Sequence, residues 1–462
     1  MIVSPSDPVL QILRENQRRK VFPGGVLCAS HHGLVNYHHA IGFATWEPTP
    51  IPITTSALFD VASLTKPVAT TAALMLLIDS GDLELDDPIG RFLPVFEGTP
   101  KADITVRHLL NHCSGFPAHI KFYEQLEELR AQGEGPPKGP ASVDWVLQQI
   151  AEMDTEPPGT KSVYSDLGFI TLGRLVEKVT SQPLQDFCEE QIFRPLGMED
   201  TFYLPSWKPE KRRKRLAGRQ IVVTEMCPWR KKLMIAEVHD ENCYSFGGVA
   251  GHAGLFSTAE DIHRFALTLW RCSRGMDNFF QASLVQEFWR KQEIVPGSTW
   301  ALGWDTPSEQ NSQVGHLFSR HGVGHLGFTG CSLWIDRDDH ILAVFLSNRV
   351  HPTRENTDIR RFRPLLHNTL YGMLTEPAPL QPPVEMGRAP ELLQVQDEAA
   401  LSANQAVHSR LRPPPSLRSA FPLSGEQSFD NLMAPPPNFE ESKPPTKPVP
   451  LPPPPTTLKA DD

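Results

Sequence analysis

The sequence predicts an α/β fold: an antiparallel sheet flanked by helices, carrying an inserted and mainly helical subdomain, followed by a Pro-rich tail. Two observations lead to this prediction. A helix and a strand hairpin open the chain, and a second hairpin and a helix close its globular part, so both ends can supply strands to one sheet. Between them, residues from about 80 to 299 have mostly helical periodicity.

The first α/β segment, about 1–79, begins with an amphipathic helix. Asp7 and Pro8 stand before apolar residues at helical spacing, a pattern typical of a capped helix with proline in its first turn. The apolar runs 26–30 and 34–41 are separated by a short turn, which predicts a hairpin.

The second α/β segment, about 300–375, contributes the other hairpin. Its strands are expected at 331–336 and 341–347, and a helix is expected at 359–374. Together the two segments and the insertion form one predicted domain, 1–375.

The insertion is expected to contain helices at 144–153, 168–179 and 259–270. We expect a cleft where this insertion joins the sheet. His108 and His112 are four residues apart, so they are placed on one helix face, as packing and capping residues near the cleft.

The segment 376–462 holds 20 of the 45 prolines and is predicted to be a disordered tail with polyproline II character. Lys447, Pro450 and Pro453 have the spacing of an SH3-type ligand, and 451–455 loosely fits an EVH1-type ligand. A partner of the tail is one hypothesis. A disordered extension without a partner is the other.

Composition and charge exclude several classes of protein. The 462 residues include 44 Lys and Arg against 54 Asp and Glu, and the net charge of −10 argues against a nucleic-acid binder. No apolar run approaches the roughly 18 to 20 residues of a membrane-spanning helix. No signal peptide is recognised at the N-terminus, so a cytoplasmic protein is expected. Seven scattered cysteines predict reduced core thiols.

The sequence Ser63-Leu64-Thr65-Lys66 opens a strongly apolar helix, expected over 67–78. A serine in the first helical turn lies beside free N–H groups, and a lysine one turn later is near enough to take the hydroxyl proton. Taken alone, the motif is better explained as a serine cap beside a solvated lysine. Two later motifs favour a nucleophile: Tyr164-Ser165-Asp166 at a helix start, and His325-Leu326-Gly327 before a strand.

These three motifs, in this order, resemble those of the serine β-lactamase and penicillin-binding protein superfamily, in particular its class C branch, which also contains esterases and D-amino-acid peptidases. There Ser-x-x-Lys is followed by Tyr-x-Asn and then by Lys-Thr-Gly or His-x-Gly. The similarity runs from about residue 7 to 372 and includes the stretches DDPIGRFLP, ITVRHLLNHCSGFP and PPGTKSVYSDLGFITLGRLVEKVT.

The resemblance implies a role for each motif residue. Ser63 would be the acyl-accepting nucleophile, with Lys66 as its proton partner. Tyr164 would be the general base and acid, working as a phenolate or through Lys66. The oxyanion hole would be formed by the backbone N–H groups of Ser63 and Phe328.

The third motif would bind substrate. His325 would orient a substrate carboxylate or carbonyl, and Gly327 would be small so that the strand can approach the substrate. Three residues depart from the family pattern: Asp166 replaces Asn, Leu326 replaces Thr, and His325 replaces Lys. These departures favour a neutral ester, lactone or amide over a substrate with a C-terminal carboxylate.

The predicted function is therefore a serine hydrolase that forms an acyl-enzyme on Ser63, acting as an esterase or a small-amide hydrolase. One alternative is a catalytically weak scaffold of the same fold whose Pro-rich tail recruits partners. A further alternative is a β-lactamase or a D-Ala-D-Ala peptidase.

No cofactor or metal is predicted. Gly322, Gly324 and Gly327 match the dinucleotide fingerprint, but a strand and not a helix is expected after them. Four residues of metal-ligand type are interpreted as hydrogen-bonded loop residues: Glu237, His239, Asp240 and His252.

Overall fold

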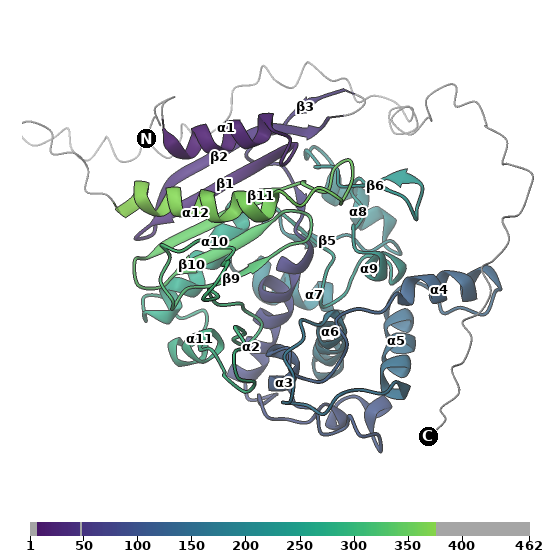
Figure 1. Cartoon of the computed structure of the whole chain (residues 1–462). Helices are drawn as coiled ribbons and strands as arrows, with labels where there is room; N and C mark the ends of the chain where they lie inside the picture. Colours follow the sequence, from purple (N-terminus) through teal and green to yellow (C-terminus); the bar gives the residue numbers. More distant parts are fainter. Residues whose placement is uncertain (1–6, 47–48, 376–462) are drawn as a thin grey trace, which may run out of the picture. The chain divides into compact units, whose positions relative to one another are not determined.

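The two ends of the described chain meet in one antiparallel sheet. The computed structural model describes residues 7–46 and 49–375, and in it six strands take the order β3-β2-β1-β11-β10-β9 (Figure 1). Because β1 pairs with β11, the N-terminal hairpin lies beside the C-terminal one, as predicted. The strands are β1 Gly24–His31, β2 Leu34–Thr45, β3 Ile51–Pro52, β9 Val323–Leu326, β10 Ser332–Asp336 and β11 Ile341–Ser347.

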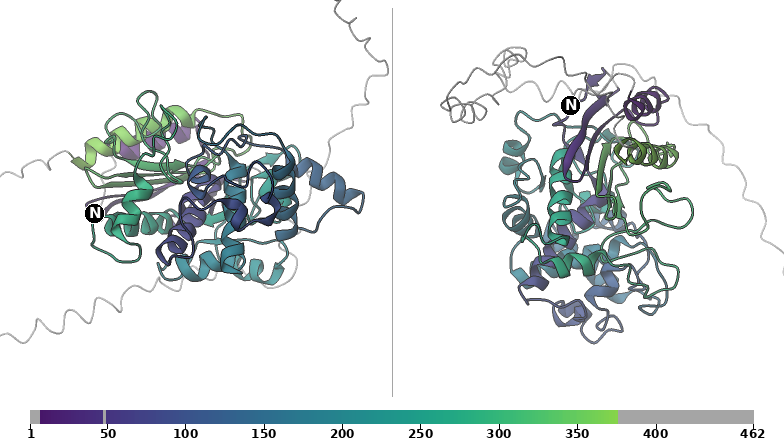
Figure 2. Two further views of the ribbon diagram at one scale, coloured as in Figure 1. Left: turned by 90° about the horizontal axis from the view of Figure 1, so that it is seen from below. Right: turned by 90° about the vertical axis from the view of Figure 1, so that its left-hand side faces the viewer.

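Both faces of this sheet are apolar, and helices cover each of them. Successive residues of a strand point to opposite faces. Phe345 packs with helices α1 (Pro8–Arg18) and α12 (Ile359–Thr375), whereas Val344 packs on the opposite face with α10 (Ala259–Ser273). Figure 2 shows the sheet between these layers. Helix α10 lies within the range assigned to the insertion, yet it packs on β11, β1 and β10 of the sheet as well as on α11.

Helix α1 begins with the predicted cap. The Asp7 carboxylate accepts hydrogen bonds from the backbone N–H groups of Val9 at 2.9 Å and Leu10 at 3.1 Å. It also accepts one from the Tyr37 hydroxyl of β2 at 3.0 Å. The cap therefore provides acceptors for the free backbone N–H groups at the start of α1, and it also attaches this helix to the sheet.

The rest of the described chain is mostly helical. Its α-helices are α2 Ala72–Asp79, α3 Val106–Leu110, α4 Phe122–Ala131, α5 Pro140–Glu152, α6 Asp166–Thr180, α7 Leu184–Cys188, α8 Pro209–Leu216, α9 Glu241–Ser245 and α11 Ala282–Trp289. Its strands are β4 Phe59–Asp60, β5 Phe202–Tyr203 and β8 Leu255–Ser257, which form a small sheet, and the pair β6 Met226–Cys227 and β7 Lys232–Leu233. The predicted tail, 376–462, with its SH3- and EVH1-type motifs, lies outside the described residues.

Two local predictions need correction. The helix expected over 67–78 is divided into a π-helical segment, Lys66–Thr71, and helix α2. Helix α3 ends before His112, whose φ of 55° is left-handed, so His108 and His112 do not share a helix face. His108 instead caps α3, because its Nδ1 accepts the Thr105 N–H at 3.2 Å.

A buried histidine joins the sheet to α10. His263 is 4% exposed, and its Nε2 lies 2.7 Å from the Ser30 hydroxyl of β1. Burial lowers the pKa of His263 to about 4. Between about pH 4 and 6.5 the His263 ring is therefore protonated in the unfolded chain and neutral in the folded protein. Because the unfolded state binds more protons, the free energy of unfolding falls as the pH falls through this window.

We expect His263→Gln to remove this dependence, because glutamine can bond Ser30 but does not titrate. On acidification from about pH 7 to about pH 4.5, the variant should lose about 2 kcal/mol less unfolding free energy than the parent. Urea unfolding at the two pH values measures the difference. Equal losses would show that His263 is not held neutral.

Candidate active site

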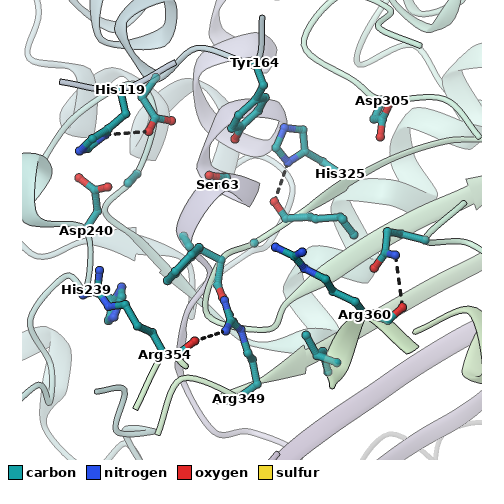
Figure 3. Close-up of a pocket in the computed structure, with 18 of the residues that line it drawn as sticks. Ser63, His119, Tyr164, His239, Asp240, Asp305, His325, Arg349, Arg354 and Arg360 are labelled. Atoms are coloured by element: carbon teal, nitrogen blue, oxygen red, sulfur yellow. Dashed lines mark hydrogen bonds and ion pairs between the residues drawn. The ribbon is translucent and has the colours of Figure 1, made fainter. Parts of the chain in front are cut away.

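A cleft of about 740 Å³ opens where strand β9 faces the Ser63 turn and the start of α6 (Figure 3). The cleft brings together six of the seven predicted site residues, from three separate parts of the chain: Ser63, Tyr164, Asp166, His325, Gly327 and Phe328. The seventh, Lys66, is fully buried beside Ser63.

Ser63 lies on a single 3-10 turn, Ala62–Leu64, directly after β4. The Asp60 carboxylate accepts the Ala62 N–H at 2.9 Å and holds Ala62 at a left-handed φ of 48°. Such backbone strain in a residue other than glycine is concentrated at functional sites. The turn exposes the Ser63 hydroxyl to the cleft, 3.1 Å from the Lys66 amine.

The Lys66 ammonium lies among four polar groups, one of which is the Tyr164 hydroxyl. Nζ donates to the Ser63 hydroxyl, to the Asp166 carboxylate at 2.7 Å, and to the His252 carbonyl at 3.2 Å. Burial by itself lowers the pKa of Lys66, but Asp166 and Tyr164 outweigh burial and leave it raised. The pKa of Asp166 is held well below its usual range because Lys66, His119 and His252 outweigh its burial. Lys66 and Asp166 are therefore a charged pair at neutral pH.

Tyr164 lies one residue before the N-cap of α6. Its ring centroid is 4.8 Å from Lys66 Nζ, and the ring stacks on Trp300 at 5.3 Å. Burial raises the pKa of Tyr164, and Lys66 only partly opposes this rise. Tyr164 is therefore a neutral phenol in the resting site.

His112 helps to place this tyrosine. Its Nδ1 accepts the Ser165 backbone N–H at 3.1 Å, and its ring lies 4.7 Å from the Tyr164 ring. The residue packs near the cleft as the sequence predicted, although from a loop and not from a helix face.

His325 lies on β9, an additional strand, and the predicted strand, β10, follows it. Its Nδ1 is 2.9 Å from the Leu326 carbonyl, which can only accept, so Nδ1 carries the ring proton. Burial and then Lys66 lower the pKa of His325 to about 3, which keeps the ring neutral. Its Nε2 is buried and has no partner in the part of the chain that the structure describes. A ring in this state has no N–H left to donate to a substrate carboxylate or carbonyl, which differs from the role expected from the motif.

Gly327 and Phe328 form the turn after β9. A Cβ on Gly327 would lie 2.5 Å from the Val61 carbonyl, so glycine lets this turn approach the Ser63 segment as well as a substrate. Among the described residues, the backbone N–H groups of Ser63 and Phe328 have no hydrogen-bond partner. Both residues line the cleft. The Phe328 side chain is 49% exposed and stacks on His239.

Sequence reasoning missed several cleft residues. The most direct is His119, whose Nδ1 lies 3.5 Å from Asp166; this contact, opposed by burial, raises the pKa of His119. No local pattern distinguishes it, since it follows a Pro-Ala turn far from the other motifs. The others missed are Trp300, Asp305, Arg349, Arg354, Arg360 and Arg363.

The four residues weighed as metal ligands pair with separate protein groups. Glu237 pairs with Lys232, His239 with Glu225 at 3.0 Å, and Asp240 with His252 at 2.9 Å. A different set, Glu225, Cys227 and Glu241, is compact enough for an ion. The Arg354 guanidinium, however, already forms ion pairs with both carboxylates of this set, those of Glu225 and Glu241.

The sheet and its cleft are those of a family of serine hydrolases. The chain belongs to the beta-lactamase family, whose model, described as Beta-lactamase, matches residues 9–367. It is 34% identical over 326 residues to an Escherichia coli K12 protein named as a candidate D-alanyl-D-alanine carboxypeptidase, covering 65% of this chain and 71% of that protein. It is 30% identical over 353 residues to a Bacillus subtilis N-acetylmuramyl-L-alanine amidase, covering 71% and 78%.

A solved structure has a similar fold. EstCE1, described as a hydrolase with promiscuous acyltransferase activity, superposes with a TM-score of 0.60 at 20% identity, covering 79% of this chain and 97% of that chain. This likeness confirms the predicted fold class, a helix-flanked antiparallel sheet of the β-lactamase and transpeptidase type. Among the residues that the structure describes, no helix is both long and apolar enough to cross a membrane.

Asp166→Asn should move the pH dependence of Ser63 reactivity toward lower pH. Asp166 raises the pKa of both candidate bases, Lys66 and Tyr164, and the deprotonated base activates the serine. The rate of Ser63 labelling by a fluorophosphonate rises with pH in both proteins, and we expect its rise to begin about one pH unit or more lower in the variant.

The exposed Asp154→Asn carries the same charge change away from the cleft and is the matched control. It should leave the profile in place. An unchanged profile in Asp166→Asn would contradict the assignment of Asp166 as the group that sets the protonation of the site.

Proposed function

We propose that the protein is a serine hydrolase that forms an acyl-enzyme on Ser63 and acts on an ester or a small amide. The observation that carries this proposal is the joint geometry of the cleft. Lys66 contacts the Ser63 hydroxyl at 3.1 Å. The N–H groups of Ser63 and Phe328, which have no partner among the described residues, line the same cleft.

In the proposed reaction, the neutral Tyr164 phenol beside charged Lys66 first loses its proton to solvent. Ser63 Oγ then attacks the substrate carbonyl, and its proton passes to the Tyr164 phenolate. The buried Lys66 charge stabilises a Tyr164 phenolate as it forms, because the attraction acts in a desolvated site. The developing oxyanion accepts from the Ser63 and Phe328 N–H groups. Tyr164 returns the proton to the leaving group, and water then releases the acid from Ser63.

Two arginines donate hydrogen bonds to carbonyls of the turn after β9, which carries the Phe328 N–H. Arg363 Nη2 donates to the Gly327 carbonyl at 3.3 Å, and this carbonyl belongs to the peptide whose N–H is that of Phe328. Arg349 Nε donates to the Phe328 carbonyl at 3.0 Å. The charged donor on the Gly327 carbonyl polarises that peptide and makes the Phe328 N–H a stronger donor to an oxyanion, whereas Arg349 only holds the turn in place.

A D-Ala-D-Ala carboxypeptidase is the second candidate, favoured by the name of the Escherichia coli relative. A scaffold without catalysis is less well supported, because Lys66 contacts the Ser63 hydroxyl and Tyr164 lies beside Lys66 in the same cleft. The Lys66 and Asp166 pair would be an unfavourable burial of charge without a reaction to serve.

Intact mass after incubation with a fluorophosphonate tests the nucleophile. We expect one adduct per chain on the parent, no adduct on Ser63→Ala, and an unchanged adduct on Ser80→Ala, an exposed serine used as the matched control. Absence of an adduct on folded parent protein would overturn the hydrolase proposal and favour the scaffold.

Turnover assays separate the two candidate activities. Aryl esters and small amides should be hydrolysed by the parent and not by Ser63→Ala. Release of free D-alanine from a D-Ala-D-Ala peptide, with a higher kcat/KM than for the neutral esters, would instead support the carboxypeptidase.

A further inference from the structure

His119 contacts the same carboxylate that binds Lys66. The two oxygens of Asp166 have different partners: Oδ1 accepts from Lys66 Nζ at 2.7 Å, and Oδ2 lies 3.5 Å from His119 Nδ1. Figure 3 shows the second contact as a dashed line from the His119 ring. Ser63, Lys66, Asp166 and His119 therefore form a continuous series of contacts that leads from the nucleophile to a side chain that is 39% exposed.

The segment that carries His119 is fixed on both sides of this residue. The Ala118 carbonyl accepts the backbone N–H of Asp166 at 2.9 Å. The Ile120 carbonyl accepts a hydrogen bond from the Asn242 side chain at 2.8 Å. The position of the imidazole beside Asp166 is therefore set by the backbone as well as by the contact between the two side chains.

The charge of Asp166 makes the base of the site harder to form. It raises the pKa of Lys66 and of Tyr164, and a base with a higher pKa is deprotonated in a smaller fraction of the molecules. The Asn of the family pattern would carry no such charge. A second cation near Asp166 opposes this effect, because it repels the charge on Lys66 and attracts a Tyr164 phenolate.

His119 is placed to be this second cation. Its contact with Asp166, opposed by burial, raises the pKa of His119, so the imidazolium persists at less acidic pH. Among the described residues, Asp166 is the only carboxylate within ion-pair distance of His119. Other charged or titratable groups near His119 already have partners. They are Asp240 with His252 and Glu241 with Arg354, at the start of α9, and Lys121 with Glu124 on the segment of His119 itself.

We propose that His119 is a positioning residue whose imidazolium shares the Asp166 carboxylate with Lys66, so that the Tyr164 proton leaves the site more readily. The inference rests on the proposed function and names a further group that controls the protonation of the same site. His119 forms no bond to the substrate. It exchanges its own proton with solvent and acts on Tyr164 only through its charge.

His119→Gln tests this role, with His321→Gln as the matched control. Glutamine keeps a side-chain donor for Asp166 but carries no charge. His321 is an exposed histidine that pairs with Asp338 at 2.9 Å and lies outside the cleft lining. The measurement is the rate of Ser63 labelling by a fluorophosphonate from about pH 5.5 to about pH 9.5, expressed as the ratio of parent to variant.

The ratio of parent to His119→Gln should be at least about threefold at the acidic end of this range and should fall to one at the alkaline end. Under acidic conditions the parent carries the imidazolium and the variant does not, whereas under alkaline conditions both side chains are neutral. Groups that titrate alike in both proteins cancel in the ratio. The ratio of parent to His321→Gln should stay at one throughout.

A ratio that does not change with pH would overturn the proposal, whether its value is one or larger. A constant value above one would mean that His119 supports the shape of the cleft and that its charge has no effect on the base. Labelling of the parent persists in both cases, whereas a parent that is not labelled at any pH contradicts the hydrolase proposal.

An NMR titration tests the pairing even if Ser63 proves inert. The ring resonance of His119 is identified by its absence from His119→Gln. In Asp166→Asn this resonance should titrate at least about half a pH unit lower than in the parent, because Asp166 raises the pKa of His119. The Asp154→Asn control should leave the titration in place. An unchanged titration in Asp166→Asn would contradict the proposal.

Discussion

The buried ion pair between Lys66 and Asp166 is the interaction on which the rest of the site depends. One ammonium joins the Ser63 turn, the start of α6 and the loop of His252, which are far apart in sequence. A charge buried this deeply must be fully hydrogen-bonded, so these three segments have little freedom to move apart. The same pair keeps Lys66 charged, and Tyr164 consequently has a cation beside it.

Charge is distributed unevenly around the cleft, and this follows from the fold. Pairing of β1 with β11 carries the chain from the sheet directly into the segment 349–363, which lies against the turn after β9. The acidic residues arrive instead from the helical part of the chain, at the start of α6 and before α9. The cleft therefore has a cationic wall on the sheet side and an acidic wall on the helical side, with Ser63 between them.

Much of this arrangement is visible in the sequence because its signals are local. The apolar periodicity of the hairpins, the Asp7 cap and the Ser63, Tyr164 and His325 motifs depend only on neighbouring residues. Other features are not decided by residues close along the chain. The local sequence of α10 predicts a helix but not its position, because its place on the sheet is set by contacts with strands remote in sequence.

The sequence by itself determined most of the strands and helices, the order of the three motifs and the family to which they point, because these are encoded in residues close along the chain. Only the tertiary structure decided the protonation of the site and the charge that faces a substrate. The pKa of His325 and the pairing of Asp166 with Lys66 depend on burial and on distances between segments remote in sequence. No local pattern records those distances.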